Sequence, residues 1–291
     1  WYNPTGSIKD RVAFYMINKA KETGDLKDGM PIIEATSGNT GISLSALGAY
    51  YKHPVYIFMP DWASVERVKL MKNFGANVIL VSREDGGFKK CLEEAEKLAK
   101  EKNGFWANQF ANQNNLLAHY ETTGSEIVSQ LPEKICAFVS GVGTGGTLMG
   151  IGKRLQNWSK DIKIIAMEPE KMPLISQNKI IENHKIEGIG DDFIPELLDK
   201  NLLDEVILVN DDDAINMSRK LSRELGLGVG ISSGANFIAS ALYQERIKKP
   251  VVTVFADDNK KYLSTDLEKE IDNNKEFISN KIQLLDYEVI S

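Results

Sequence analysis

The chain of 291 residues carries a formal net charge of -6, and 42% of its residues are hydrophobic and 26% are charged. This length suffices for two domains of ordinary size, each with its own core, and the composition is typical of a soluble globular protein. The small net charge argues against a nucleic-acid surface. Since no apolar run approaches the roughly 18 residues of a membrane span, we expect a cytoplasmic enzyme with neither a nucleic-acid nor a membrane partner.

The cysteines and histidines are too scattered to form a disulfide framework or a metal site. Cys91 lies in a charged helical stretch and Cys136 at the head of an apolar strand. The histidines, His53, His119 and His184, are far apart in the sequence and have no ligand spacing. We therefore expect both cysteines to be structural and no metal to be bound.

The first motif is a turn that leads into a helix, at residues 3–11. Ser7 and Asp10 have the spacing of an N-cap and its acidic partner, and apolar residues then recur at helical spacing as far as Gly24, a stop signal. The prediction puts Lys9 in the first turn, where the helix dipole disfavours a cation and helps to keep an amine neutral and nucleophilic. The alternative is an ordinary solvated lysine.

A second motif follows a predicted strand at residues 31–34. Residues 35–41 form a turn rich in hydroxyl side chains, and a helix of small residues is predicted from 42 to about 51. Open α/β sheets bind ligands at such strand-to-helix turns, where free helix N–H groups suit an anion. The alternative is a polar helix cap without a ligand.

Strands and helices then alternate along the chain. We predict strands at 54–59 and 77–81, helices at 64–74 and 88–100, a polar and aromatic loop at 106–112, and a long helix at about 115–130.

The third motif is a glycine-rich loop at residues 141–147, directly after an apolar strand at 135–140. Consecutive backbone N–H groups in such a loop can form an anion nest, with a phosphate as the natural guest. The loop also satisfies G-x-G-x-x-G, with Glu168 at the end of the next strand, so dinucleotide binding is a competing hypothesis. A tight turn without a ligand is a third.

The remaining elements continue the alternation and indicate an α/β protein with mostly parallel sheets. They are strands at 162–168, 206–209 and 251–255, an irregular loop at 188–195, a helix at 211–225, and a glycine-rich turn at 226–234.

Taken together, the three motifs and the strings at 230–234 and 262–264 resemble the cysteine synthase (O-acetylserine sulfhydrylase) family. These are fold-type II enzymes, similar to the tryptophan synthase β subunit, that depend on pyridoxal 5'-phosphate (PLP). The resemblance covers nearly the whole chain. It implies two α/β domains, a smaller mobile substrate-binding one at 12–111 and a larger PLP-binding one formed by 1–11 plus 112–291. Family members carry a few dozen residues before the lysine motif, so we expect that a chain starting at Trp1 lacks this segment.

The resemblance also implies roles for individual residues. Lys9 corresponds to the lysine that holds PLP and acts as the base, and Asn39 to the asparagine that bonds the cofactor's ring hydroxyl. The other assignments are a phosphate cradle of Gly143, Thr144, Gly145, Gly146 and Thr147, and substrate-carboxylate contacts from Thr36, Ser37, Thr40 and Gln109.

Two aspartate pairs depart from the family pattern. Asp191 and Asp192 stand where biosynthetic members usually have small residues, in a loop that faces the substrate's β-carbon. A carboxylate there could take a proton from water and would repel anionic sulfide, unless both aspartates point to solvent. Asp257 and Asp258 stand beside the expected pyridine nitrogen, where an aspartate in contact would protonate that nitrogen. The sequence does not say which one, if either, faces the ring.

The activity that this resemblance implies is PLP-dependent β-replacement. We predict that L-cysteine releases hydrogen sulfide and that water adds to give L-serine, as in the hydrogen-sulfide-producing cysteine lyase branch. The alternatives are cysteine synthesis from O-acetylserine and sulfide, lanthionine formation from two cysteines and, from another class, an NAD-dependent oxidoreductase. The family also implies a homodimer and serine acetyltransferase as a partner.

Overall fold

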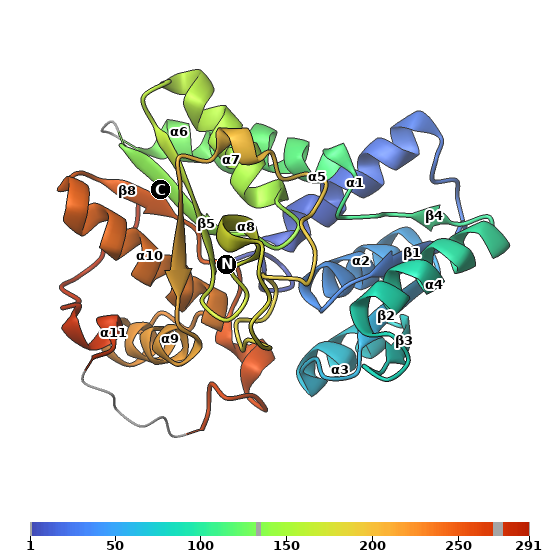
Figure 1. The fold of residues 1–291 in the computed structure, drawn as a ribbon. Coiled ribbons are helices and arrows are strands. Elements are labelled where there is room, and N and C mark those ends of the chain that lie inside the picture. Colours follow the sequence, from blue (N-terminus) through green and yellow to red (C-terminus); the bar gives the residue numbers. More distant parts are fainter. Residues whose placement is uncertain (1, 132–134, 270–275, 291) are drawn as a thin grey trace.

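The computed structural model describes residues 2–131, 135–269 and 276–290; Trp1, where the sequence begins, lies outside them. Two four-stranded sheets, each packed against helices, form the two halves of the molecule (Figure 1). Every strand pair in these sheets is parallel. The predicted α/β class with mostly parallel sheets is therefore confirmed.

The first sheet has the strand order β3-β2-β1-β4. The strand at the edge beside β1 was not predicted. It has only two residues, too few to show the alternation of apolar and polar side chains that marks a strand, and the sequence indicated a loop from residue 106. Phe105 pairs with Ile32 of β1 and so makes a short edge strand. The strands are β1 (Ile32–Ala35), β2 (Val55–Pro60), β3 (Asn77–Val81) and β4 (Phe105–Trp106).

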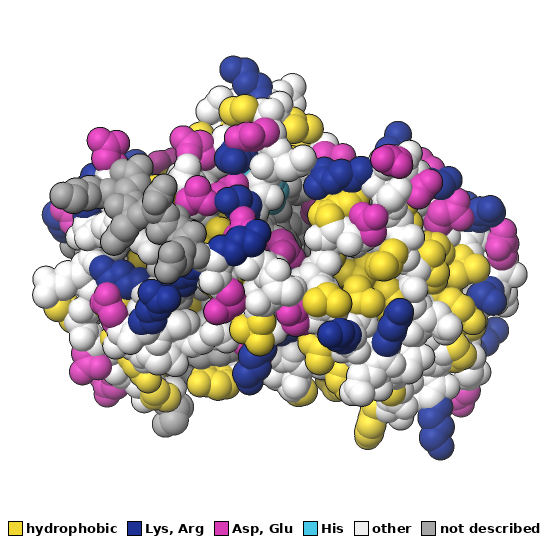
Figure 2. Space-filling view, turned by 90° about the horizontal axis from the view of Figure 1, so that it is seen from below, with side chains coloured by type: hydrophobic (Ala, Val, Ile, Leu, Met, Phe, Trp, Pro, Cys, Tyr) yellow, Lys and Arg dark blue, Asp and Glu magenta, His cyan; other side chains and the backbone are white. Residues whose placement is uncertain are grey.

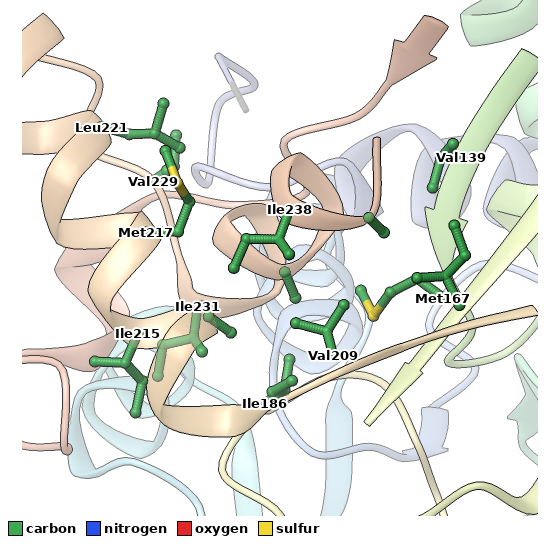
Figure 3. Close-up of a cluster of buried hydrophobic side chains, with 14 of the residues drawn as sticks. Val139, Met167, Ile186, Val209, Ile215, Met217, Leu221, Val229, Ile231 and Ile238 are labelled. Atoms are coloured by element: carbon green, nitrogen blue, oxygen red, sulfur yellow. The ribbon is translucent and has the colours of Figure 1, made fainter. Parts of the chain in front are cut away.

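The second sheet has the order β7-β6-β5-β8 and packs against α10, which in turn packs against α9. Figure 3 shows side chains of both helices and of the sheet meeting in one apolar cluster, among them Leu221, Ile238 and Met167, all fully buried. The strands are β5 (Ala137–Gly141), β6 (Lys163–Pro169), β7 (Glu205–Val209) and β8 (Val251–Thr253).

The helices follow the predicted positions closely, with one interruption. The helix expected at 115–130 contains a π-helical turn, η1 (His119–Thr123), between α5 (Gln113–Ala118) and α6 (Gly124–Gln130). The others are α1 (Lys9–Thr23), α2 (Asn39–Tyr51), α3 (Val65–Asn73), α4 (Gly87–Glu101), α7 (Gly146–Trp158), α8 (Leu174–Gln177), α9 (Asp211–Leu225), α10 (Ile231–Ile247) and α11 (Ile278–Lys281), with short 3-10 turns η2 (Lys200–Leu202) and η3 (Asn259–Tyr262).

The start of α1 differs from the predicted capping box. Ser7 Oγ accepts a hydrogen bond from the Lys9 N–H at 3.3 Å. The Asp10 carboxylate instead accepts from the Thr5 N–H at 2.7 Å and from the Ser43 hydroxyl of α2 at 2.6 Å. Tertiary contact with α2 therefore overrides the local pattern. The N-cap is Ile8 and not the predicted Ser7, so the helix begins at Lys9, which is still in the first turn; the helix ends at a glycine with φ 81°.

The division into domains stays a prediction, and the positions of the sheets agree with it. The first sheet falls within residues 32–106 and the second within 137–253. Helix α1 packs with the first sheet, because Val12 and Met16 share an apolar cluster with Ile57. Within the part of the chain that the structure describes, no helix has both the length and the apolar character needed to cross a bilayer.

Candidate active site

Three connected hollows lie between the two halves of the molecule. The outer cleft, of about 680 Å³, runs between β2 and α4 on one side and residues 183–192 on the other, and Figure 2 shows the surface hollowed between the two halves. The middle cavity is lined by Lys9, Thr36, Ser37, Asn39, Thr40, Arg67, Gln109, Phe110, Gly143, Thr144, Gly188 and Asp191. The inner cavity shares Lys9, Asn39, Gly143, Thr144 and Gly188 with it and continues to Ser232, Asn236, Val254 and Ala256.

Lys9 lines both the middle and the inner cavity. It is the first residue of α1, so its backbone stands at the positive end of that helix, as predicted. Burial lowers the pKa of its amine from the ordinary value to about 8, although the charge of Asp191 acts in the opposite direction. At pH 7 about a tenth of the amine is therefore neutral, far more than for an ordinary lysine, and the neutral form is the one that nucleophilic and base chemistry require.

Asn39 is the first residue of α2 and reaches across to the second half of the molecule. Its Nδ2 donates a hydrogen bond to Asp257 Oδ2 at 2.8 Å. Its Oδ1 is buried without a hydrogen-bond partner among the described residues. An unpaired buried oxygen is costly, so this atom is ready to accept a hydrogen bond from a ligand hydroxyl.

The glycine loop at 141–147 lines the inner cavity and ends in α7, and the N-terminus of a helix suits an anion. The first N–H of this helix, that of Gly146, donates to the Thr144 hydroxyl at 3.3 Å. A Cβ at Gly143 would stand 2.4 Å from the Gly188 carbonyl oxygen, so only glycine fits there. The Thr147 hydroxyl lies 3.1 Å from His119 Nε2. Burial, then the charges of Lys9 and Arg11, keep the pKa of His119 well below its ordinary value. A neutral imidazole therefore orients the Thr147 hydroxyl.

The predicted carboxylate-binding residues meet in the middle cavity. The Thr40 hydroxyl donates to Gln109 Oε1 at 2.5 Å, and Gln109 Nε2 donates to the Ala35 carbonyl at 3.0 Å. A supporting glutamate, Glu34, was not predicted; it is fully buried and accepts from the backbone N–H of Gln109 at 3.1 Å. Burial raises the pKa of Glu34 to about 8. The predicted residues Thr36, Ser37, Thr40 and Gln109 all line this cavity.

The structure distinguishes between Asp191 and Asp192. Asp191 is partly buried and lines the middle cavity together with Lys9, whereas Asp192 is exposed and lines only the outer cleft. Burial first, and then the charge of Asp192, raise the pKa of Asp191 to about 7, while the charge of Lys9 opposes this shift. Asp191 can therefore gain or lose a proton near neutral pH.

Asp257 and Asp258 are held by other side chains. Asp257 is fully buried and its Oδ2 accepts from the Tyr262 hydroxyl at 2.7 Å as well as from Asn39. Asp258 Oδ1 lies 3.3 Å from the Lys261 amine. The described residues lining the inner and middle cavities do not include either aspartate. A contact with the pyridine nitrogen stays a prediction for both.

Two further groups at these cavities were missed in the sequence. Ser232, at the start of α10, lines the inner cavity; the sequence placed it in a glycine-rich turn and in a string typical of the family, without a role in the site. Arg67 of α3 lines the middle cavity, forms an ion pair with Glu187 and lies over the Tyr262 ring at 4.5 Å. A full-length arginine that is 2% exposed is unusual, but nothing local in the sequence marks it as buried.

The structure argues against dinucleotide binding at the glycine loop, because the acidic residue that would bind the ribose hydroxyls, Glu168, is already engaged. Glu168 is 2% exposed and accepts hydrogen bonds from the backbone N–H groups of Ile175 and Ser176 at 2.8 and 3.0 Å. Its carboxylate stabilises the start of α8, so it is not available to ribose hydroxyls. In the described residues, no group of three or more histidine, cysteine or acidic side chains is placed to hold a metal ion.

PLP fits the residues that are present. The Lys9 amine, whose pKa is lowered, lines the same cavity as Asn39, whose Oδ1 is unpaired. The glycine loop also lines this cavity; it has no room for a Cβ at Gly143 and is followed by a helix N-terminus. These are groups for an aldehyde, a ring hydroxyl and a phosphate, respectively.

The family comparison agrees with this chemistry. Residues 1–257 match the model of the pyridoxal-phosphate-dependent enzyme family, and the chain belongs to that family. It is a PLP-dependent enzyme of the cysteine synthase type.

Three relatives are informative. Cysteine synthase B of Campylobacter jejuni is 42% identical over 267 residues, which are 91% of this chain and 88% of the relative. The crystal structure of a hydrogen sulfide-producing enzyme from Fusobacterium nucleatum is 51% identical, with a TM-score of 0.92, over 96% of this chain and 85% of that one. An aspartate-to-asparagine variant of that enzyme, complexed with an α-aminoacrylate intermediate, matches with the same identity and coverage and a TM-score of 0.93.

Proposed function

We propose that this enzyme converts L-cysteine and water into L-serine and hydrogen sulfide. The C–S bond at the β-carbon breaks and sulfur leaves as sulfide; a C–O bond forms with water, and the protons balance between the two products. PLP, when bound, supplies the electron sink for the loss of the α-proton. Lys9 is the residue that anchors the cofactor, and it holds the α-proton on its amine after taking it from the substrate.

The observation that carries this proposal is the presence of Asp191 in the same cavity as Lys9 and the carboxylate-binding residues. With a pKa near 7, Asp191 is able to accept a proton from an attacking water at neutral pH. Its negative charge also disfavours hydrosulfide as the incoming nucleophile. Both effects favour water over sulfide in the second half of the reaction.

The substrate carboxylate is expected to bind between the end of β1 and the Gln109 loop. Thr36, Ser37, Thr40 and Gln109 surround this end of the middle cavity. The Glu34 carboxyl beneath them has a pKa of about 8 and is mainly protonated at pH 7, so it places little negative charge under the bound anion.

The solved relatives support the same direction. The Fusobacterium nucleatum protein at 51% identity is a hydrogen sulfide-producing enzyme, and its aspartate-to-asparagine variant was obtained with an α-aminoacrylate intermediate. An intermediate that accumulates when an aspartate is neutralised agrees with a carboxylate acting in the second half-reaction.

Cysteine synthesis from O-acetylserine and sulfide is the second candidate, because the Campylobacter jejuni relative at 42% identity is a cysteine synthase. The two candidates share Lys9, Asn39 and the phosphate cradle and differ in the nucleophile. The homodimer, the serine acetyltransferase partner and the cytoplasmic location stay predictions.

The test gives the PLP-loaded protein L-cysteine alone, measures sulfide, and identifies the amino-acid product by mass. Sulfide with serine in equal amounts is the expected result. Lanthionine would make a second cysteine the nucleophile, and pyruvate would indicate elimination without replacement; either contradicts the proposal. Cysteine formed from O-acetylserine and sulfide, with no sulfide from cysteine, would establish the second candidate instead.

A further inference from the structure

The segment that carries Asp191, residues 187–193, connects β6 and β7 of the second sheet but contacts the first half of the molecule at both ends. We refer to it as the aspartate loop. At its start, Glu187 forms an ion pair with Arg67 of α3. At its end, Phe193 packs against an apolar cluster of the first sheet that includes Ile33 and Phe58. Asp191 lies between these two contacts.

The contact at Phe193 is made by three aromatic rings. The Phe193 ring meets Phe110 edge to face, with 5.1 Å between centroids, and stacks on Phe88 with 6.4 Å between centroids. Phe88 and Phe110 are themselves 5.5 Å apart. Since ring pairs of this geometry stabilise beyond the area they bury, the end of the aspartate loop is fixed to α4 and to the loop after Gln109.

The middle of the loop is tied to the second half of the molecule. The Gly190 N–H donates to the Val142 carbonyl at 3.0 Å, and the Gly190 carbonyl lies 2.7 Å from His184 Nε2. Gly190 has a φ of 67°, which turns the chain immediately before Asp191. The direction of the Asp191 side chain therefore depends on a hydrogen-bonded turn before it and an aromatic anchor two residues after it.

Each of the three rings lines a cavity that Asp191 also lines. Phe110 lines the middle cavity with Asp191, Phe88 lines the outer cleft with it, and Phe193 lines a small cavity next to it. In the part of the chain that the structure describes, the side chains that act on the Asp191 carboxyl are Asp192 and Lys9, through their charges, and no side chain donates a hydrogen bond to it. Its position must come from the segment on either side.

From these contacts we propose that Phe193 is the positioning residue for Asp191: its ring, held between Phe88 and Phe110, keeps the carboxylate directed at the middle cavity, where water is to be activated. This inference rests on the proposed function. It requires Phe193 to matter for the addition of water and not for the release of sulfide. When water addition slows, the three-carbon fragment leaves as pyruvate and ammonia, so that L-cysteine and water give pyruvate, ammonia and hydrogen sulfide.

The test compares Phe193→Leu and Phe193→Ala with Phe237→Leu. Phe237 is also partly buried and pairs with another ring, Phe255, at 6.3 Å, but it packs in the second half of the molecule, away from the loop. We expect the Phe193 variants to release sulfide within about twofold of the parent, while the ratio of serine to pyruvate falls by about tenfold or more. The control should keep the parent ratio. An unchanged ratio, or equal losses of sulfide and serine, would overturn the inference.

A second measurement does not depend on the cofactor or on activity. In protein without PLP, amide hydrogen exchange of peptides covering 186–193 should become at least about tenfold faster in Phe193→Leu and stay unchanged in Phe237→Leu. If the parent makes no serine from cysteine, the proposed function fails, and exchange alone then decides whether Phe193 anchors the loop. Equal exchange rates in the parent and Phe193→Leu would refute the anchor.

Discussion

Asp191 and Asp257 are two buried or partly buried carboxylates near the same cavities, and their surroundings are opposite. Asp257 accepts hydrogen bonds from Asn39 and Tyr262, and the Arg67 guanidinium lies 3.9 Å away. Asp191 lines cavities that Phe110 and Phe193 also line, and the charges that act on it are those of Asp192 and Lys9. The first group therefore has hydrogen-bond donors on one of its oxygens, whereas burial disfavours the ionised form of the second.

Under the proposed function Asp191 is the reactive carboxylate, whereas the contacts of Asp257 in this structure are with side chains of the protein. Asp257 Oδ2 accepts the hydrogen bond that holds the Asn39 amide, and Asp257 Oδ1 is buried without a hydrogen-bond partner among the described residues. A partly buried carboxylate without such donors exchanges its proton near neutral pH. Neutralising each aspartate in turn should therefore have different effects on the products, on the pH profile and on stability.

The largest expected effect is on the product. Asp191→Asn should lower serine formation by about 100-fold, because the proton acceptor for water is lost, and sulfide release should fall much less. Asp257→Asn should leave the ratio of serine to sulfide near the parent value. The measurement is product analysis with L-cysteine alone. Serine formation that survives at parent level in both Asp191→Asn and Asp192→Asn would exclude a role for the loop carboxylates.

The pH profile should show the second effect. The Asp191 carboxyl must be ionised to accept a proton, and its pKa is about 7. Serine formation by the parent should therefore fall about tenfold for each pH unit below 7. Asp191→Asn should lose this dependence, and Asp257→Asn should keep it. A parent profile that is flat between pH 5.5 and 7 would contradict the assignment.

Stability should change in opposite directions at pH 8. Asp257→Asn removes a hydrogen-bonded charge beside Arg67 and should lower the free energy of unfolding by about 1–3 kcal/mol. Asp191→Asn should raise it by about 1–2 kcal/mol. A carboxyl whose pKa is raised in the folded state binds its proton more tightly there, so stability is lost as the pH rises toward 7.

Urea unfolding at pH 8 and pH 5 measures both changes. The gain from Asp191→Asn should shrink at pH 5, where the folded parent is already protonated at this position. A loss of stability in both variants at pH 8 would mean that Asp191 has stabilising donors after all.

The smallest effect belongs to Asp192→Asn. Asp192 is exposed, and it acts on Asp191 only through its charge. Its removal should shift the rise of serine formation to lower pH by less than about one unit and should change the rate at pH 8 by less than about twofold. If Asp192→Asn lowers serine formation as much as Asp191→Asn does, then Asp191 is not the sole proton acceptor and the assignment to this member of the pair is wrong.

Much of the site could be predicted because its parts are local. The turn before α1 places Lys9 in the first turn of a helix, and its role as the cofactor lysine is implied by the resemblance to the family. The glycine loop follows from its own composition, since backbone N–H groups converge wherever glycines permit it. Glu34, Arg67 and Ser232 were missed because each lies in a segment whose local pattern is that of an ordinary strand, helix or turn. Their roles come from what packs against them.

By itself, the sequence determined the alternation of strands and helices, the parallel α/β class and the three turns that line the cavities, because these depend on residues that are neighbours in the chain. Only the tertiary structure decided which aspartate of the 191–192 pair faces the cavity, and that Asp257 binds Asn39, a residue 218 positions away. It also replaced the predicted Ser7 and Asp10 capping box with contacts to α2. Burial and hydrogen bonding between distant segments set the charge state and direction of these side chains, and a local pattern does not contain that information.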